Sequence, residues 1–183
     1  MITEKREART AAAARRAEAH RVLGPRPPGA AAALLRALEG AEGPVAGYWP
    51  IRTEIDPRPV MEALSEQGVE LCLPEVVARA APLRFRRWRP GAALAPAGFG
   101  LSVPRDAPEV TPRVLIVPLL AFDAERFRLG YGGGHYDRTL ALLRAGGPLR
   151  AVGFAYAAQQ VAAVPREATD ARLDVITTEA GSV

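Results

Sequence analysis

The chain has 183 residues, of which 49% are hydrophobic and 24% charged, and these values are ordinary for one soluble globular domain with a substantial core. No apolar run approaches the ~20 residues that a membrane-spanning helix needs, and the charged, Ala-rich N-terminus lacks the apolar centre of a signal peptide. Cys72 is the single cysteine and excludes an internal disulfide, so we expect a cytoplasmic protein without a membrane partner.

The net charge of +4 is concentrated at the N-terminus. Residues 1–26 carry seven basic and three acidic side chains, so they hold the whole positive excess and the remainder is neutral. A nucleic-acid surface usually needs a broader basic face with interleaved aromatic residues, so we expect no nucleic-acid partner. A local cluster suits a small polyanion better, although a solvated charged helix explains the charge equally well when that segment is taken alone.

The first half of the chain alternates between helical patterns and short apolar segments. Residues 3–22 predict an Ala- and Arg-rich helix, and Lys5 and Arg9, four residues apart, project from one face of it. A second helix is predicted over residues 30–38, a short buried strand in PVAGYWP, a helix in DPRPVMEALSEQG and a strand in VELCLP.

The second half continues the alternation. VLIVPLLAF, residues 114–122, is a continuous apolar run that is typical of a central strand. A helix is predicted from about Tyr136 to Arg144, and strands in AVGFAY and LDVITTE. Residues 79–112 break the pattern with proline and glycine and predict a short hairpin or a long ordered loop. We therefore predict an α/β fold in a single domain over residues 1–183: a three-layer sandwich with a mainly parallel sheet and helices on both faces.

The stretch RLGYGGGHYDR, residues 128–138, carries the strongest chemical signal. It contains Gly130, Gly132, Gly133 and Gly134 and lies between the predicted central strand and the next helix. Ligands of open α/β sheets collect at this carboxyl end of the strands. Converging glycine N–H groups and a helix N-terminus favour an anion, most often phosphate.

Two charged residues of this stretch refine the prediction. Arg128 supplies a charge-assisted donor, whereas Asp137 would repel a phosphate unless a metal lay between them, so Asp137 is a candidate Mg²⁺ ligand. The spacing matches neither the Rossmann fingerprint nor a P-loop. A glycine-rich turn that serves only close packing is the alternative interpretation.

PLLAFDAERFRLGYGGGHYDRTL resembles the signature of the 5-formyltetrahydrofolate cyclo-ligases, also called methenyltetrahydrofolate synthetases. The N-terminal KREAR, TEIDPRPV after the first strand and the C-terminal VPREATDARLDVITTE follow in the family's order, so the resemblance covers essentially the full chain. It implies a ligase that converts 5-formyltetrahydrofolate and ATP, with Mg²⁺, into 5,10-methenyltetrahydrofolate, ADP and phosphate. We expect a monomer whose partners are these small molecules.

The resemblance also implies which residues bind each ligand. The folate would be bound by Glu54, with Trp49 and His135 close to it, and Mg²⁺ by Asp137 and Asp170. ATP would be bound by two basic residues of the N-terminal helix, residues 1–26, and by the glycine-rich stretch. The full set is Lys5, Arg9, Arg128, Gly130, Tyr131, Gly132, Gly133, Gly134, His135 and Tyr136. The arginines of RFRRWR, residues 84–89, could meet the substrate carboxylates.

Three positions depart from the family's pattern. His135 replaces the first of two tyrosines, Arg126 stands where a glycine is usual, and Val103 where an acid is frequent. Two other functions stay open beside the ligase. One is a small-molecule kinase or phosphotransferase with the same phosphate loop, and the other is a folate- or nucleotide-binding protein without turnover.

Overall fold

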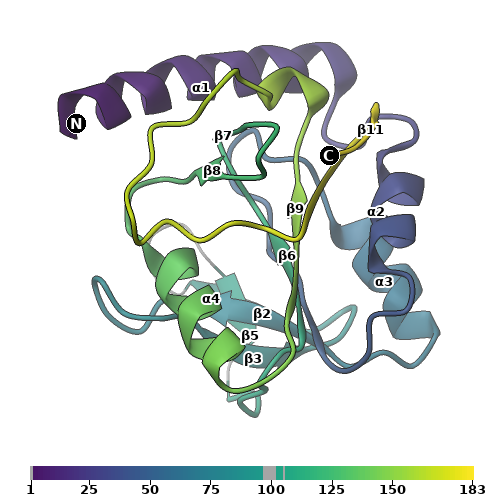
Figure 1. Ribbon diagram of the computed structural model, residues 1–183. Helices are drawn as coiled ribbons and strands as arrows, with labels where there is room; N and C mark the ends of the chain where they lie inside the picture. Colours follow the sequence, from purple (N-terminus) through teal and green to yellow (C-terminus); the bar gives the residue numbers. More distant parts are fainter. Residues whose placement is uncertain (1, 97–101, 105) are drawn as a thin grey trace.

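The computed structural model describes residues 2–96, 102–104 and 106–183. Within this part of the chain, one seven-stranded sheet forms the centre of the molecule (Figure 1). Its strands are β1 (Val45–Ala46), β2 (Leu71–Glu75), β3 (Arg84–Trp88), β6 (Val114–Val117), β9 (Arg150–Phe154), β10 (Val175–Thr178) and β11 (Gly181–Ser182).

The sheet has the order β11-β10-β9-β6-β1-β2-β3 and is parallel from β10 to β2. The edge strands β3 and β11 run antiparallel to their neighbours. β1 is in register with both neighbours, since Val45 pairs with Leu71 and with Val114. All four residues of β6 are buried, as expected for a strand covered on both faces.

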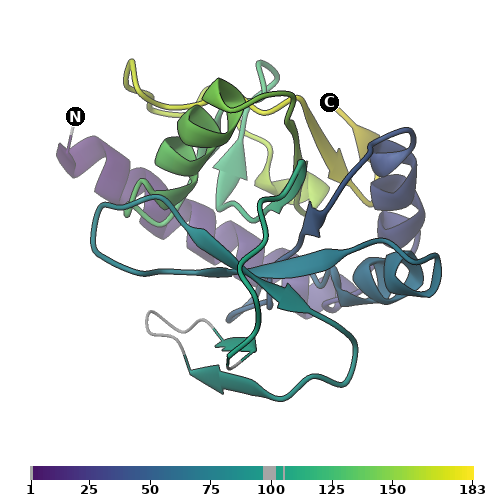
Figure 2. The ribbon, with the colours of Figure 1, turned by 90° about the horizontal axis from the view of Figure 1, so that it is seen from below.

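Helices cover both faces of the sheet, which confirms the predicted α/β sandwich with a mainly parallel sheet. The helices α2 (Ala30–Leu38) and α3 (Arg58–Glu66) pack on one face, and α4 (His135–Ala145) packs on the other (Figures 1 and 2). The apolar residues of α2 recur at helical spacing, so its buried side chains form one stripe toward the sheet: Ala30, Ala33, Leu34, Ala37 and Leu38.

The helix α1 (Ile2–Leu23) lies across the carboxyl end of the sheet, along the top of Figure 1. It packs against the short 3₁₀ helix η1 (Ala157–Gln159), which follows β9, and its buried Ala12 joins Leu120 and Leu129 in a small apolar cluster. The predicted basic helix thus reaches the end of the sheet where the glycine-rich stretch lies.

The predicted end of the central strand is wrong. The apolar run 114–122 is not one strand, because β6 ends at Val117, directly before Pro118. The chain then forms β7 (Ala121–Phe122), which pairs with β8 (Arg128–Leu129) in a separate antiparallel ribbon. A proline lacks the N–H that would continue the ladder, which explains the break.

The described part of the region 79–112 contains three short strands. Its residues 84–88 are the edge strand β3, a placement that was not predicted because Phe85 and Trp88 are buried at a spacing of three rather than two. The predicted hairpin is present as β4 (Leu94–Pro96) paired with β5 (Ser102–Pro104); the residues between these two strands lie outside the described part.

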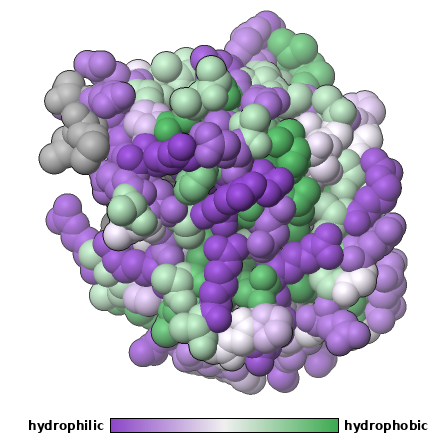
Figure 3. Space-filling view, viewed as in Figure 1, coloured by the Kyte–Doolittle hydropathy of each residue, from purple (hydrophilic) through white to green (hydrophobic). Residues whose placement is uncertain are grey.

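The face of the molecule in Figure 3 is a mosaic of hydrophilic and smaller hydrophobic areas. Exposed large hydrophobic side chains include Val22 and Leu23 at the end of α1, and Val77, Tyr131 and Leu142 on three other segments. Among the described helices, none combines the length and apolar character that crossing a membrane requires.

Candidate functional site

The glycine-rich stretch forms the loop between β8 and the N-terminus of α4, as predicted. Gly132 has a φ of +100° and Gly134 a φ of +64°, and both values favour glycine because a Cβ makes this backbone strained. Gly134 is the N-cap of α4, and within the described chain no side chain caps this terminus. The first-turn N–H groups of α4 are therefore not satisfied by a capping side chain and suit an anion.

Basic side chains crowd the glycine backbone. A Cβ on Gly132 would lie 3.1 Å from Arg9 Cζ, and one on Gly134 would lie 2.7 Å from the terminal nitrogen Nη1 of Arg138. A Cβ on Gly133 would meet the imidazole ring of the next residue but one at 2.6 Å. Close packing thus explains part of the glycine content, and the groups that pack here are ones that attract an anion.

The helix α1 contributes two of the predicted phosphate-binding residues. Lys5 Nζ lies 2.9 Å from Asp170 Oδ2 and 3.2 Å from Glu167 Oε1. Burial alone would lower the pKa of Lys5, but these two carboxylates outweigh it and raise that pKa, so the ammonium stays charged. Arg9 donates from Nε to the carbonyl oxygen of Gly130 at 3.0 Å, which fixes α1 against the loop.

Arg128 and Asp137 form an ion pair, with 2.8 Å between Nη2 and Oδ1. Both residues also bond to Ala171: Arg128 donates to its carbonyl oxygen at 2.8 Å, and the Asp137 carboxylate accepts from its N–H at 3.0 Å. The pair therefore joins the glycine loop to the segment that contains Asp170. It also explains how an acidic residue lies beside an anion loop, since the guanidinium offsets its charge.

Glu54 is buried, with only 5% of its surface exposed. Its Oε2 accepts from the Ile51 N–H at 2.9 Å, and its Oε1 accepts from the Tyr131 hydroxyl at 2.8 Å. Burial raises the pKa of Glu54 above its ordinary value, although these hydrogen bonds and nearby arginines oppose the shift. The structure thus joins Glu54, the residue predicted to bind folate, to the loop predicted to bind ATP through one hydrogen bond.

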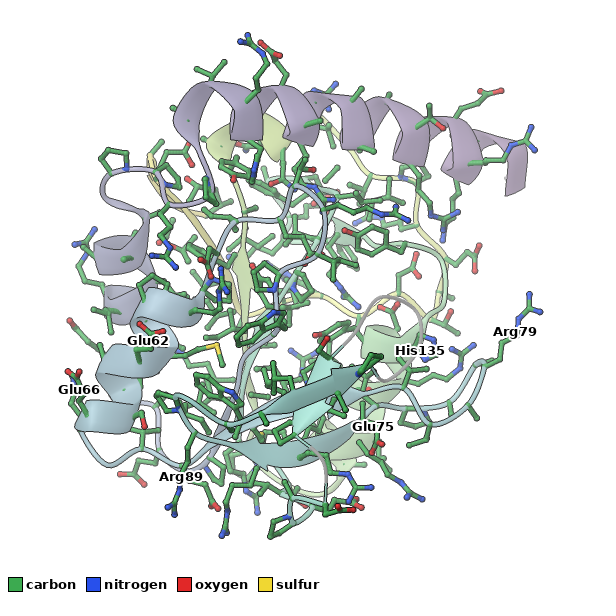
Figure 4. The ribbon with its side chains drawn as sticks, turned by 180° about the vertical axis from the view of Figure 1, so that it is seen from behind. Glu62, Glu66, Glu75, Arg79, Arg89 and His135 are labelled. Atoms are coloured by element: carbon green, nitrogen blue, oxygen red, sulfur yellow. The ribbon has the colours of Figure 1, made fainter. Side chains whose placement is uncertain are left out.

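Trp49 and His135, the other predicted folate contacts, lie in different surroundings. Trp49 is half-buried, packs edge-on against Trp88 with ring centres 6.3 Å apart, and carries the Arg58 guanidinium 4.8 Å from its ring centre. His135, labelled in Figure 4, begins α4, and its Nδ1 lies 2.8 Å from the carbonyl oxygen of Ala81. This contact ties the glycine loop to the segment before β3.

The remaining sequence predictions have these outcomes. Tyr136 packs its ring on the α4 face of the sheet. Two arginines of RFRRWR are already paired, Arg86 with Glu75 and Arg87 with Glu70, each at 2.8 Å. Burial raises the pKa of the Cys72 thiol to about 12, so this cysteine stays protonated and unreactive near neutral pH.

Arg126 and Val103, two positions that depart from the family's pattern, keep regular backbone pairing. Arg126 has a φ of +68°, a left-handed conformation that favours glycine, yet its N–H still closes the turn onto the Asp123 carbonyl oxygen at 3.0 Å. Val103 is buried in β5.

Arg16 is the site residue that the sequence prediction missed. Its side chain is 2% exposed, and it donates from Nη1 to the Tyr131 hydroxyl at 2.7 Å and from Nε to Thr53 Oγ1 at 3.1 Å. The available signal was periodicity, because Arg16 follows Lys5 and Arg9 at a spacing that places all three on one helical face.

The fold and this site define an α/β protein that carries an anion-binding glycine loop beside a buried carboxylate. The chain matches the 5-formyltetrahydrofolate cyclo-ligase family over residues 2–179 and belongs to that family. It is 35% identical over 131 residues to the 5-formyltetrahydrofolate cyclo-ligase of Escherichia coli (strain K12), covering 68% of this chain and 71% of that protein. The cyclo-ligase of Mycolicibacterium smegmatis is 37% identical over 107 residues, which are 52% of this chain and 54% of that one. The prediction of an enzyme of the ligase class is therefore confirmed.

Two solved structures are similar to the chain. The NMR structure of Aquifex aeolicus 5,10-methenyltetrahydrofolate synthetase aligns with a TM-score of 0.73 at 29% identity, covering 97% of this chain and 91% of that one. A 5,10-methenyltetrahydrofolate synthetase from Mycoplasma pneumoniae aligns with the same TM-score at 20% identity, covering 96% and 99%, and supports the fold alone.

Proposed function

We propose that this protein cyclises 5-formyltetrahydrofolate to 5,10-methenyltetrahydrofolate and releases ADP and phosphate from ATP. The observation that carries the proposal is the hydrogen bond between Tyr131 of the glycine loop and Glu54. It joins a loop suited to phosphate and a buried carboxylate suited to the N–H and amino groups of a pterin edge. The test is formation of the methenyl product with ATP and Mg²⁺, followed by its absorbance in the near ultraviolet.

The nucleotide phosphates would lie on the glycine loop at the N-terminus of α4. Arg9 reaches this loop from α1, and within the described chain no acceptor bonds to its terminal nitrogens. Lys5, one turn earlier on the same face, is paired with Asp170. Arg128 on β8, which is paired with Asp137, is the third basic group beside the loop. These groups neutralise charge on a transferring phosphoryl group, which is the main help that a protein can give to phosphoryl transfer. Tyr131, His135 and Tyr136 would complete the nucleotide contacts.

Asp137 and Asp170 fit the role of Mg²⁺ ligands. Mg²⁺ is usually held by one or two carboxylates together with substrate phosphates and water, not by an all-protein cage. The two residues lie on segments joined through Ala171, and in the described part of the chain no cluster of three or more His, Cys, Asp or Glu side chains forms a cage elsewhere. The ion would supply further charge neutralisation at the phosphates.

The proposed reaction has two steps. The formyl oxygen attacks the γ-phosphate, so that the bond between the β- and γ-phosphates breaks and ADP leaves with an iminium phosphate remaining on the folate. N10 then adds to the iminium carbon, loses its proton, and the C–O bond breaks to release phosphate. Glu54 holds the pterin, Trp49 offers an apolar surface beside it, and the loop holds the phosphoryl group near the formyl oxygen.

Gly132→Ala should raise the KM for ATP by about tenfold, because a Cβ at a φ of +100° strains the loop and displaces Arg9. Gly40→Ala is the matched control, since Gly40 also has a left-handed φ, +68°, but faces open space away from the loop. Steady-state kinetics with varied ATP measures both variants. An unchanged KM for ATP in Gly132→Ala would remove the loop from the nucleotide site.

A further inference from the structure

The guanidinium of Arg16 is buried between two parts of the site. Its contacts are Thr53, the Tyr131 hydroxyl at 2.7 Å and Glu54, whose Oε1 lies 3.8 Å from Nη1. Thr53 and Glu54 belong to the segment after β1, and Tyr131 belongs to the glycine loop. Arg16 therefore bridges the segment proposed for folate and the loop proposed for ATP.

Burial of the Arg16 charge costs free energy of desolvation. A fully buried arginine is rare because desolvation of the charge must be offset by partners. The buried positions one turn away on the same face of α1, Ala12 and Ala19, are small and apolar. An apolar residue at position 16 would therefore continue the packing of α1 without this cost.

The hydrogen bonds around Tyr131 have one consistent direction. Its hydroxyl accepts from Arg16, so its own proton is available to donate to Glu54 Oε1 at 2.8 Å. The second carboxylate oxygen is held by the Ile51 N–H. A chain of three side chains thus fixes how the carboxylate is turned, and it begins at Arg16.

We propose that Arg16 is a positioning residue that holds Tyr131 and Glu54 in one arrangement, so that nucleotide binding and folate binding strengthen each other. The proposal rests on the proposed function of the two segments. Any ligand that orders Tyr131 on the nucleotide side also orders Glu54 on the folate side. Because binding free energies are linked, each ligand must improve the affinity of the other by the same factor.

The electrostatics give a second signature of Arg16. Its positive charge lowers the pKa of Glu54 against the larger effect of burial, which raises it. The other groups that interact electrostatically with this carboxylate are Arg52, Tyr48, Tyr131 and Tyr136. Loss of the Arg16 charge therefore raises the pKa of Glu54 further, and the acid limb of folate binding moves to higher pH.

The experiment measures the Kd of 5-formyltetrahydrofolate by titration calorimetry, with and without a non-hydrolysable ATP analogue, at several pH values. The wild type should show a coupling factor of about fivefold or more. Arg16→Gln and Tyr131→Phe should bring this factor close to one, whereas Arg15→Gln, which removes the same charge from an exposed position of α1, should keep it. Arg16→Gln and Tyr131→Phe should both move the acid limb to higher pH, because the Tyr131 hydrogen bond and the Arg16 charge each lower the pKa of Glu54. Arg16→Lys, which keeps the charge without the planar fork, should not move it.

Thermal unfolding first establishes that each variant is folded. An unchanged coupling factor in folded Arg16→Gln would overturn the proposal. If Arg16→Gln does not fold, Tyr131→Phe decides alone, since Tyr131 is 43% exposed and its hydroxyl can be removed without opening the core. A wild type that binds both ligands with coupling but forms no methenyl product would contradict the proposed reaction and leave this proposal intact.

Discussion

Glu54→Gln is expected to lower kcat/KM for 5-formyltetrahydrofolate by about a hundredfold or more. The buried carboxylate accepts hydrogen bonds only, whereas the amide of glutamine turns a donor toward the donors of the pterin edge. The affinity for the ATP analogue alone should change far less, because Glu54 reaches the loop through a single hydroxyl contact. Steady-state kinetics and calorimetry separate the two effects.

The pH profile of the wild type checks the same residue. Burial raises the pKa of Glu54, so its ionised form is lost on acidification at higher pH than for an exposed glutamate. The acid limb of kcat/KM should therefore lie above the ordinary range of glutamate and vanish in Glu54→Gln. Glu66→Gln is the control, since Glu66 lies exposed on α3, far from His135 in Figure 4. Equal folate kinetics in the two variants would remove Glu54 from the substrate site.

Asp56→Asn is expected to destabilise the protein by about 3 kcal/mol, the low end of the range for removing one partner of a buried ion pair. The Asp56 carboxylate is 1% exposed and bonds to Arg26 and Arg58 at 2.8 Å, and it also accepts from the Arg58 N–H at the start of α3. Both arginines reach solvent, which places the effect at that end of the range. Chemical denaturation measures the loss, and a fall of about 5–10 °C in Tm should accompany it.

The direction of the pH effect follows from the pKa of Asp56. Burial alone would raise that pKa, but the hydrogen bonds from Arg58 and Arg26 outweigh it and hold the pKa below its ordinary value. This contribution to stability is therefore present above the ordinary pKa and lost as the pH falls through the lowered one. The difference between wild type and Asp56→Asn should shrink over that interval. Glu125→Gln, which breaks an exposed pair with Arg166, should change stability little, and an equally small effect of Asp56→Asn would contradict the account.

Much of the fold could be predicted because local patterns and packing agree. The helix predicted over 30–38 is α2 itself, since its apolar spacing matches the face that it buries. The apolar run from Val114 identified the central strand, but not its end at Val117. The edge strand β3 was missed because RFRRW shows no alternation, and its pairing with β2 depends on residues 9 to 17 positions away.

Some parts of the candidate site could also be predicted from the sequence, and others could not. The glycine loop and the start of α4 were predictable because conformation and anion chemistry require the same residue types locally. The contact of Arg16 with Tyr131 and Glu54 was not, since it joins three segments up to 115 residues apart. The pairing of Arg128 with Asp137 also depends on the tertiary position of Ala171.

The most direct test of the central claim is an absorbance assay with 5-formyltetrahydrofolate, ATP and Mg²⁺. The absorbance in the near ultraviolet should rise only when ATP is present, should not rise once the metal is chelated, and should be matched by release of ADP. A folded protein that binds the ATP analogue but gives no methenyl product would contradict the central claim, and ADP release with another acceptor would indicate a phosphotransferase.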